Sequence, residues 1–209
     1  AERARLDSFR VPKRRRDWLL GRWTAKHLIR SYLAETHPPA PPLDAILILA
    51  DEDGAPYAAL DEPRVLRRLP LSLSISHSGD RSFCALTDLP AAAVGADVET
   101  IEARPDSLVK QFFTSEENAA VSAAPGTQRD ALVTAVWGAK ESVLKALHLG
   151  LRADTRQVRC LPQEEMLSGR WALLEATVDP DLLGTTRALN AWSLVGDDCV
   201  LSLALLTVP

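Results

Sequence analysis

Two carboxylates lie two residues apart in the segment Val94–Glu99, and this spacing suits a metal ion. Side chains alternate along a strand, so Asp97 and Glu99 are expected to project from the same face. Adjacent carboxylates repel one another, and a cation between them removes that repulsion. Oxygen ligands beside phosphate groups are the surroundings that Mg²⁺ prefers. Two acids at an exposed strand end would give the same pattern, so this segment alone leaves both interpretations open.

A second group of candidate residues lies in the segment Trp137–Lys145. Glu141 and Lys145 are four residues apart, so they share one face of a predicted helix. An ordinary exposed ion pair is one interpretation. The other is a carboxylate that serves as metal ligand or base beside an ammonium group that binds phosphate.

The third group is the segment Ser74–Gly79, in which a histidine lies between two serines. On a strand, Ser76 and Ser78 lie on one face and His77 on the other. Adjacent serine and histidine residues on one strand cannot form a hydrolase triad locally. The hydroxyls and the imidazole suit the oxygens of a phosphate group instead, while a purely structural histidine is the alternative.

Helices and strands that could position these groups follow from apolar periodicity and turn residues. We predict helices over 13–35 and 128–149, and a further helix that opens at Ser115, whose side chain can cap it. Strands are predicted at 43–50, 71–75, 82–87, 91–99, 171–178, 188–195 and 199–207. The order is not a strict alternation of strand and helix, which favours an α+β fold with mainly antiparallel sheets.

Length and composition exclude several classes of protein. The 209 residues are 46% hydrophobic and 25% charged, which is ordinary for a globular chain and not for a disordered one. The longest apolar runs, such as 45–50, are too short to span a bilayer. The three cysteines are widely separated, so neither a zinc site nor a disulfide scaffold is expected, and a reducing cytoplasm fits best. The spacing of the ten glycines excludes a dinucleotide-binding loop and a P-loop.

Charge is distributed unevenly along the chain. Residues 1–30 contain ten basic and three acidic residues, a net charge of +7, although the whole chain carries −4. A basic start on an acidic body indicates a local anionic ligand, with a solvated helix face as the alternative. The basic stretch is too short, and the whole chain too acidic, for a surface that tracks nucleic acid.

Taken together, the order and spacing of the motifs resemble the 4′-phosphopantetheinyl transferase superfamily. The pattern is Ser-His-Ser at 76–78, Gly-x-Asp-x-Glu at 95–99 and Trp-x-x-Lys-Glu-Ser-x-x-Lys at 137–145. The segment Phe112–Glu117 and the basic stretch Arg14–Lys26 fit the same family. The likeness covers residues 3–150 and is strongest to the longer, surfactin-synthetase-activating (Sfp-type) branch.

This resemblance implies an enzyme that moves the phosphopantetheine arm of coenzyme A to a serine of an acyl or peptidyl carrier protein, releasing 3′,5′-ADP. By position, Asp97, Glu99 and Glu141 would hold Mg²⁺, or Mn²⁺ in its place. Glu141 is the best candidate to accept the serine proton, directly or through metal-bound water, so Glu141, Lys145 and Asp97 are the expected catalytic residues. Lys140 would assist with phosphate or only flank the site.

The resemblance also implies how coenzyme A is held. Lys145 would contact the pyrophosphate, His77 with Ser76 a phosphate of coenzyme A, and Arg22 and Lys26 the 3′-phosphate. One departure from the family is Ala55, in Gly-Ala-Pro, where many relatives carry a lysine or arginine.

The family fold is a pseudo-two-fold pair of similar α+β halves, each with a small sheet and a long helix, with coenzyme A in the cleft between them. We expect the halves to be residues 1–104 and 105–209, and the protein to be a monomer because one chain supplies both. Two other functions stay open. A non-catalytic module that binds coenzyme A or a carrier protein is one, and a nucleic-acid-binding protein that uses the basic helix is the other.

Overall fold

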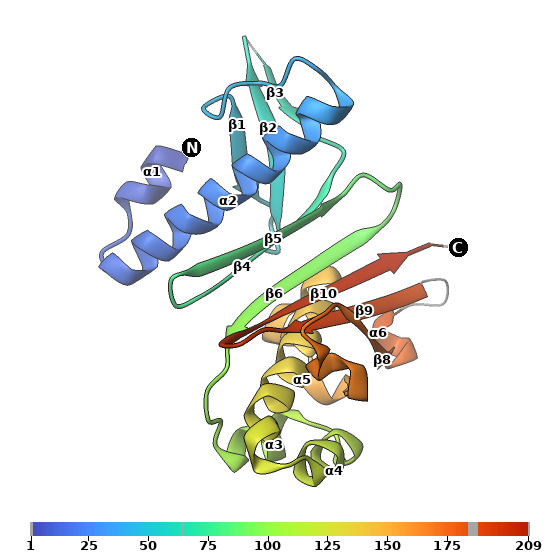
Figure 1. The fold of residues 1–209 in the computed structure, drawn as a ribbon. Coiled ribbons are helices and arrows are strands. Elements are labelled where there is room, and N and C mark those ends of the chain that lie inside the picture. The colour runs from blue at the N-terminus through green and yellow to red at the C-terminus, as the bar shows by residue number, and fades with distance from the viewer. Residues whose placement is uncertain (1, 64, 184–187, 209) are drawn as a thin grey trace.

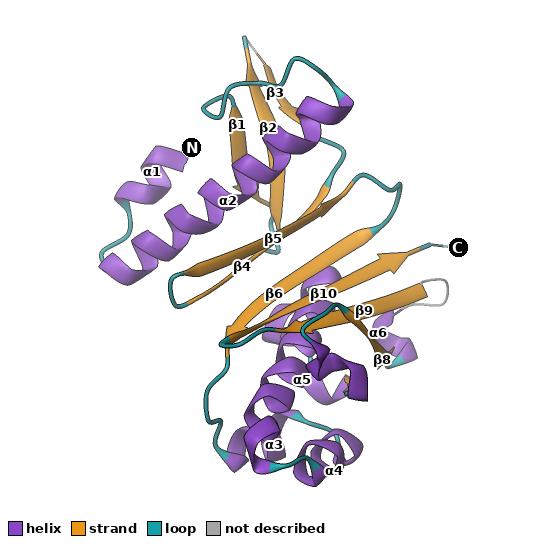
Figure 2. Cartoon of the chain, viewed as in Figure 1, coloured by secondary structure: helices purple, strands orange, loops and turns teal. Residues whose placement is uncertain are grey.

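The fold combines helices with antiparallel sheets, as the sequence predicts (Figures 1 and 2). A computed structural model describes residues 2–63, 65–183 and 188–208. Every paired set of strands in these residues is antiparallel. None of the helices in this part of the chain combines the length and the apolar character that crossing a membrane requires.

The N-terminal part places one long helix against two small sheets (Figure 1). Its elements are α1 (Glu2–Asp7), α2 (Pro12–Thr36), β1 (Ile46–Ala50), β2 (Pro56–Glu62), β3 (Val65–Arg68), β4 (Ser72–Ser78) and β5 (Arg81–Thr87). The predicted helix over 13–35 is therefore confirmed. It buries one stripe at four-residue spacing, which includes Ala25, Ile29 and Leu33, against the core formed with β1, β2 and β4.

The C-terminal part contains a five-stranded sheet in the order β6-β10-β9-β8-β7, with α5 packed on one face. Its longer elements are β6 (Ala93–Thr100), α3 (Asp106–Phe112), α4 (Ser115–Ala123), α5 (Gly126–Ala146), β7 (Val158–Leu161), β8 (Ala172–Val178), α6 (Pro180–Leu183), β9 (Ala188–Val195) and β10 (Cys199–Thr207). Short 3₁₀ turns occur at Gly150–Arg152, Thr155–Gln157 and Glu164–Ser168. The apolar face of the sheet and α5 form the largest buried cluster.

β6 pairs with the C-terminal sheet, although it precedes the boundary that we expected at residue 104. Its register places Asp97 opposite Ser202 of β10. The β4-β5 hairpin lies beside β6 and brings the N-terminal part against this edge of the sheet (Figure 1). The pseudo-two-fold relation between the halves stays a prediction.

Serine hydroxyls join β4 to β6 in place of a backbone ladder. Ser72 Oγ accepts a hydrogen bond from the backbone N–H of Val94 at 3.0 Å, and Ser74 Oγ accepts one from Ala96 at 2.9 Å. The alternating serines of β4 therefore provide hydrogen-bond acceptors for backbone amide groups at the edge of β6, which would otherwise lack them. This contact fixes Ser76 beside the carboxylates of β6.

Local boundaries differ from the sequence prediction in two places. Thr114, not Ser115, caps α4: its hydroxyl accepts from the Glu117 N–H, and the Glu117 carboxylate accepts from the Thr114 N–H. The helix α5 ends at Ala146 instead of 149, and His148 follows it with a left-handed φ of 58°. The strands β2, β3 and β7 were not predicted. β3 and β7 have only four residues each, and β2, with seven, buries three consecutive residues instead of alternating.

Candidate active site

Two glycines allow α5 to lie unusually close to the sheet. A Cβ atom on Gly95 of β6 would stand 1.7 Å from the carbonyl oxygen of Ser142, and one on Gly138 of α5 would stand 2.9 Å from Ser202 Oγ. Only glycine fits at a backbone approach of this kind. The contact brings the α5 face that carries Glu141 and Lys145 against Asp97 and its neighbours.

We expect Gly95→Ala to destabilise the protein by about 3 kcal/mol, because the added methyl group meets backbone that cannot rotate away. Urea unfolding followed by circular dichroism measures this loss. Gly126→Ala is the matched control, since a Cβ atom there meets nothing within 4 Å. A native-like free energy of unfolding for Gly95→Ala would contradict the close approach.

Asp97 is the centre of a buried polar network. Its Oδ1 atom accepts hydrogen bonds from Lys145 Nζ at 2.7 Å and from Ser76 Oγ at 2.7 Å. Lys145 Nζ also donates to Ser76 Oγ at 3.0 Å and to the backbone oxygen of Ala96 at 3.2 Å. The Oδ2 atom is buried and has no hydrogen-bond partner within the described residues. Asp97 therefore has one oxygen fully engaged and one that lacks any partner.

Glu141 lies beside this network with a buried oxygen of its own. Its Oε1 atom likewise has no partner in the part of the chain that the structure describes. Burial raises the pKa of Glu141, with Asp97 and Glu99 adding to the rise, although Lys145 opposes it. The site thus destabilises the ionised carboxylate, and a proton or a cation would relieve that cost.

Glu99 is held by a different cation. Arg104 Nη2 donates to Glu99 Oε2 at 2.9 Å, and Ser78 Oγ lies 3.4 Å from the same oxygen. Burial raises the pKa of Glu99, as does the charge of Asp97, while Arg104 opposes the rise. Asp97, Glu99 and Glu141 thus interact electrostatically, and their role as a metal-binding set stays a prediction.

The three carboxylates do not form a ready metal cluster. Among residues 2–63, 65–183 and 188–208, no group of three histidine, cysteine or acidic side chains is arranged to hold an ion. Two of the three carboxylates have cationic partners instead, since Lys145 pairs with Asp97 and Arg104 with Glu99. The donor set nevertheless fits Mg²⁺, because the carboxylates are oxygen ligands and two of their oxygens are buried without partners among the described residues.

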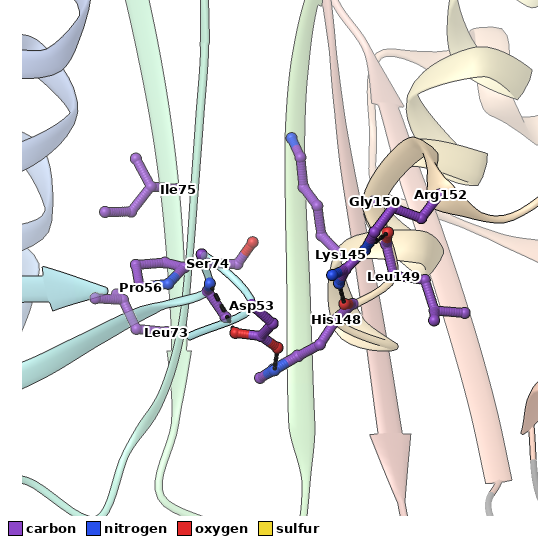
Figure 3. A pocket seen from close by; sticks show the side chains of 12 residues that line it. Asp53, Pro56, Leu73, Ser74, Ile75, Lys145, His148, Leu149, Gly150 and Arg152 are labelled. Carbon is purple, nitrogen blue, oxygen red and sulfur yellow. Dashed lines mark hydrogen bonds and ion pairs between the residues drawn. The ribbon is translucent and has the colours of Figure 1, made fainter. Parts of the chain in front are cut away.

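A cavity of about 420 Å³ lies next to this network (Figure 3). One wall comes from the turn before β2 and from β4, and it includes Pro56, Leu73 and Ile75. The other wall comes from the end of α5 and includes Lys145 and His148. His148 Nδ1 lies 3.2 Å from Asp53 Oδ2, so this contact spans the cavity from one wall to the other (Figure 3).

A second cavity, of about 450 Å³, shares Gly54, Pro56 and Ile75 with the first. Its remaining lining is rich in basic groups, because α1 and α2 contribute arginines and β4 contributes an imidazole. These groups are Arg5, Arg14, Arg22 and His77. The two cavities together form one cleft with Lys145 in the first cavity and the arginines in the second.

Arg22 is the most enclosed of these cations. Its guanidinium group lies 3.8 Å from the ring centroid of Trp18, and its Nε atom is buried without a partner among the described residues. Burial lowers the pKa of Arg22 to about 10, with Arg5 adding to the fall and Glu2 opposing it. A bound anion would offset this cost. Lys26, by contrast, is not among the residues that line the second cavity, and it pairs with Glu2 at 2.6 Å.

Lys140, which the sequence leaves either as a phosphate contact or as a flanking residue, lines neither cavity. Its side chain is fully buried, and its Nζ atom donates to Glu117 at 2.8 Å and to the backbone oxygens of Thr155 and Val158. These acceptors take all three protons of the ammonium group. Ser76 is also buried, and it contacts Asp97 and Lys145 instead of lining either cavity.

The sequence did not indicate a role for Arg104. Gly95 was identified only as part of the Gly-x-Asp-x-Glu motif, without a structural role. The ion pair of Arg104 with Glu99 joins residues five apart through a segment without regular structure, so no periodicity indicates it. Arg14 was part of the basic stretch but was not singled out, although it lines the second cavity. Residues seven apart lie on the same face of a helix, so the spacing of Arg14 and Gly21, which both line this cavity, could have indicated Arg14.

Comparison with known proteins gives a family match for part of the chain. Residues 93–167 match the family model described as the 4′-phosphopantetheinyl transferase superfamily. A curated protein of Synechocystis sp. named "Putative 4′-phosphopantetheinyl transferase" is 29% identical over 102 residues. That alignment covers 48% of this chain but only 39% of the relative, so it spans well under half of that protein.

Two solved structures align with about half of the chain. A holo-(acyl-carrier-protein) synthase from Bacillus anthracis in complex with CoA (3′,5′-ADP) has a TM-score of 0.46 and 14% identity over 56% of this chain and 96% of its own. A Chronobacterium ammoniagenes ACPS–CoA complex has a TM-score of 0.45 and 18% identity over 57% and 98%. The matched residues 93–167 run from β6 past α5 and β7 into the 3₁₀ turn at Glu164–Ser168, and they contain all three carboxylates. The segment that supplies the acidic network thus carries the sequence pattern of the 4′-phosphopantetheinyl transferase superfamily.

Proposed function

We propose that this protein transfers the 4′-phosphopantetheine arm of coenzyme A to a serine of an acyl or peptidyl carrier protein. The observation that carries the proposal is the pair of buried carboxylate oxygens, Asp97 Oδ2 and Glu141 Oε1, that have no partner in the described part of the chain and lie beside Lys145. They lie in the segment that matches the transferase family. A cationic cleft adjoins them, as a ligand with several phosphate groups requires.

Coenzyme A carries a pyrophosphate and a separate 3′-phosphate, and the cleft offers cations in two places. We assign the 3′-phosphate to Arg22 with Arg14 and His77, because these groups line one cavity and Arg22 is partly desolvated. We assign the pyrophosphate to Lys145, which lines the other cavity while it contacts Asp97. Ser76 acts by fixing the positions of Lys145 and Asp97, and Lys26 and Lys140 are left out of the ligand contacts.

Asp97, Glu99 and Glu141 are the residues that would hold Mg²⁺. The ion would offset the negative charge that develops on the pyrophosphate and the leaving group. Glu141 is our candidate to accept the proton of the carrier serine, directly or through a water molecule, because its carboxyl group lies close to both Asp97 and Lys145. Lys145 orients the phosphate groups, and no serine nucleophile of this chain is required because the partner supplies one.

We further propose the Sfp-type branch, a pseudo-two-fold pair of halves and a monomeric protein. The cleft supports this arrangement, because α2 and β4 from the N-terminal part and α5 from the C-terminal part all contribute to it. A single chain therefore supplies both walls.

The direct test is the intact mass of an apo-carrier protein after incubation with this protein, coenzyme A and Mg²⁺. We expect a gain of one phosphopantetheine arm, and no gain in a matched reaction with a chelator. Coenzyme A binding without transfer to any of several carriers would instead favour a non-catalytic binding module. The proposal would be refuted if the protein neither bound coenzyme A nor transferred the arm.

Arg22→Met is expected to weaken coenzyme A binding by roughly 10- to 100-fold, which corresponds to the loss of one charge-assisted hydrogen bond to phosphate. Isothermal titration calorimetry measures the dissociation constant. The control is a second ligand, 3′-dephospho-coenzyme A, whose affinity should be nearly equal for the two proteins. An equal loss for both ligands would remove Arg22 from the 3′-phosphate site.

A further inference from the structure

We infer that Arg104 is an internal counter-ion that competes with a divalent cation for Glu99. The inference rests on the proposed function, since it assigns Glu99 to the metal-binding group. The observation behind it is the ion pair of 2.9 Å between Arg104 Nη2 and Glu99 Oε2, in which both side chains are largely enclosed.

The charges around the site show why a counter-ion is needed. Asp97, Glu99 and Glu141 would together bring three negative charges into a poorly hydrated place, where like charges interact strongly. Lys145 offsets one of them through Asp97, and Arg104 offsets a second through Glu99. A divalent cation bound to the same carboxylates would supply two further positive charges and repel Arg104.

The two cations differ in their freedom to move. Lys145 Nζ has three protein acceptors and extends from the packed helix α5. Arg104 lies in the segment 101–105 between β6 and α3, which has no regular structure. Its guanidinium also has a second partner, because Nη1 lies 3.3 Å from the more exposed Glu102. Arg104 can therefore release Glu99 and keep an ion pair.

The consequence is a defined exchange at Glu99. The carboxylate pairs with Arg104 before a cation binds, and the cation takes its place while the guanidinium turns to Glu102. Arg104 thus offsets the repulsion between Glu99 and the other two carboxylates in the metal-free protein, and it lowers the affinity for the metal ion. It is a positioning residue, and it needs no contact with the substrate.

The test is a titration with Mn²⁺ at fixed ionic strength, with free Mn²⁺ measured by electron paramagnetic resonance. We expect Arg104→Gln to bind Mn²⁺ on the order of tenfold more tightly than the native protein, because a nearby positive charge is lost. Arg104→Lys, which keeps the charge, should stay close to native. The control is Arg129→Gln, which breaks a similar ion pair, with Asp106 at 2.7 Å, between α5 and α3.

A second readout is the thermal midpoint. Without Mn²⁺ we expect Arg104→Gln to unfold at a lower temperature than the native protein, and saturating Mn²⁺ should raise its midpoint by more. Mn²⁺ affinity that is unchanged or weaker in Arg104→Gln would overturn the inference and make Arg104 a support for the ligand set. If that variant does not fold, Glu102→Gln decides: removal of the alternative partner should weaken Mn²⁺ binding about threefold, and unchanged affinity would overturn the inference.

These outcomes are separable from the fate of the proposed function. A native protein that transfers the arm, with Arg104→Gln unchanged in Mn²⁺ affinity, would refute only the role of Arg104. A native protein that binds neither Mn²⁺ nor coenzyme A and transfers nothing would refute the proposed function and this inference with it.

Discussion

Glu141→Gln is expected to abolish transfer while leaving the protein at least as stable as the native form. The amide has the shape of the carboxylate but can neither accept the serine proton nor bind a cation strongly. Loss of a general base alone lowers the rate by roughly 10²- to 10⁴-fold. Stability should not fall, because the Oε1 atom that changes has no hydrogen-bond partner within the described residues.

The pKa of Glu141 determines whether Glu141→Gln raises or lowers the free energy of unfolding at a given pH. The pKa of Glu141 is raised in the folded protein, chiefly by burial. Between the unfolded-state pKa and this raised value, the folded state binds more protons, so its stability falls as the pH rises. Glu141→Gln lacks this loss. The variant should therefore equal or exceed the native free energy of unfolding at neutral pH, and the difference should shrink once Glu141 is protonated in both states.

Urea unfolding at two pH values and single-turnover intact mass measure the two halves of this expectation. Asp130→Asn, a change to a half-exposed side chain on the same helix, should leave both transfer and stability near native. A Glu141→Gln protein that is clearly destabilised yet transfers the arm would show that the residue is structural.

Motifs within one strand or one helix could be placed from the sequence, because alternation and helical spacing fix which side chains share a face. Asp97 with Glu99 and Glu141 with Lys145 are predictions of this kind, and in the structure these four side chains lie close enough to interact electrostatically. The contact between Ser76 and Asp97 was not predictable. It depends on the offset between β4 and β6, which serine hydroxyls set without a backbone ladder.

Lys140 shows a second limit of the sequence: adjacent residues in a helix need not reach the same site. It directly precedes Glu141, but successive helical residues are rotated by about 100°. The side chain of Lys140 therefore points into the core, where it meets Glu117, and not toward Asp97. Arg104 could not be predicted for a different reason. Its segment has no regular secondary structure, so the direction of its side chain could not be inferred from the sequence.

Lys140→Met is expected to cost about 3–5 kcal/mol of unfolding free energy, the usual loss when one member of a buried ion pair is removed. Both side chains of the Lys140–Glu117 pair are fully buried, and they lie 2.8 Å apart. Glu117 also accepts hydrogen bonds from the backbone N–H groups of Thr114 at 2.7 Å and Cys160 at 2.6 Å. The pair thus joins α4, α5 and β7, and the variant leaves a buried carboxylate without its cation.

Chemical unfolding of Lys140→Met beside Lys110→Met, an exposed lysine on α3, measures this cost. The double variant Lys140→Met/Glu117→Gln should recover part of the loss, because it removes the uncompensated charge. The recovery is incomplete, since the single amide oxygen can keep only one of the two backbone hydrogen bonds, which reach different oxygens of the Glu117 carboxylate. Such coupling is the signature of a structural pair. A Lys140→Met protein of native stability that has lost coenzyme A affinity would show the reverse, and it would return Lys140 to the ligand site from which its buried contacts exclude it.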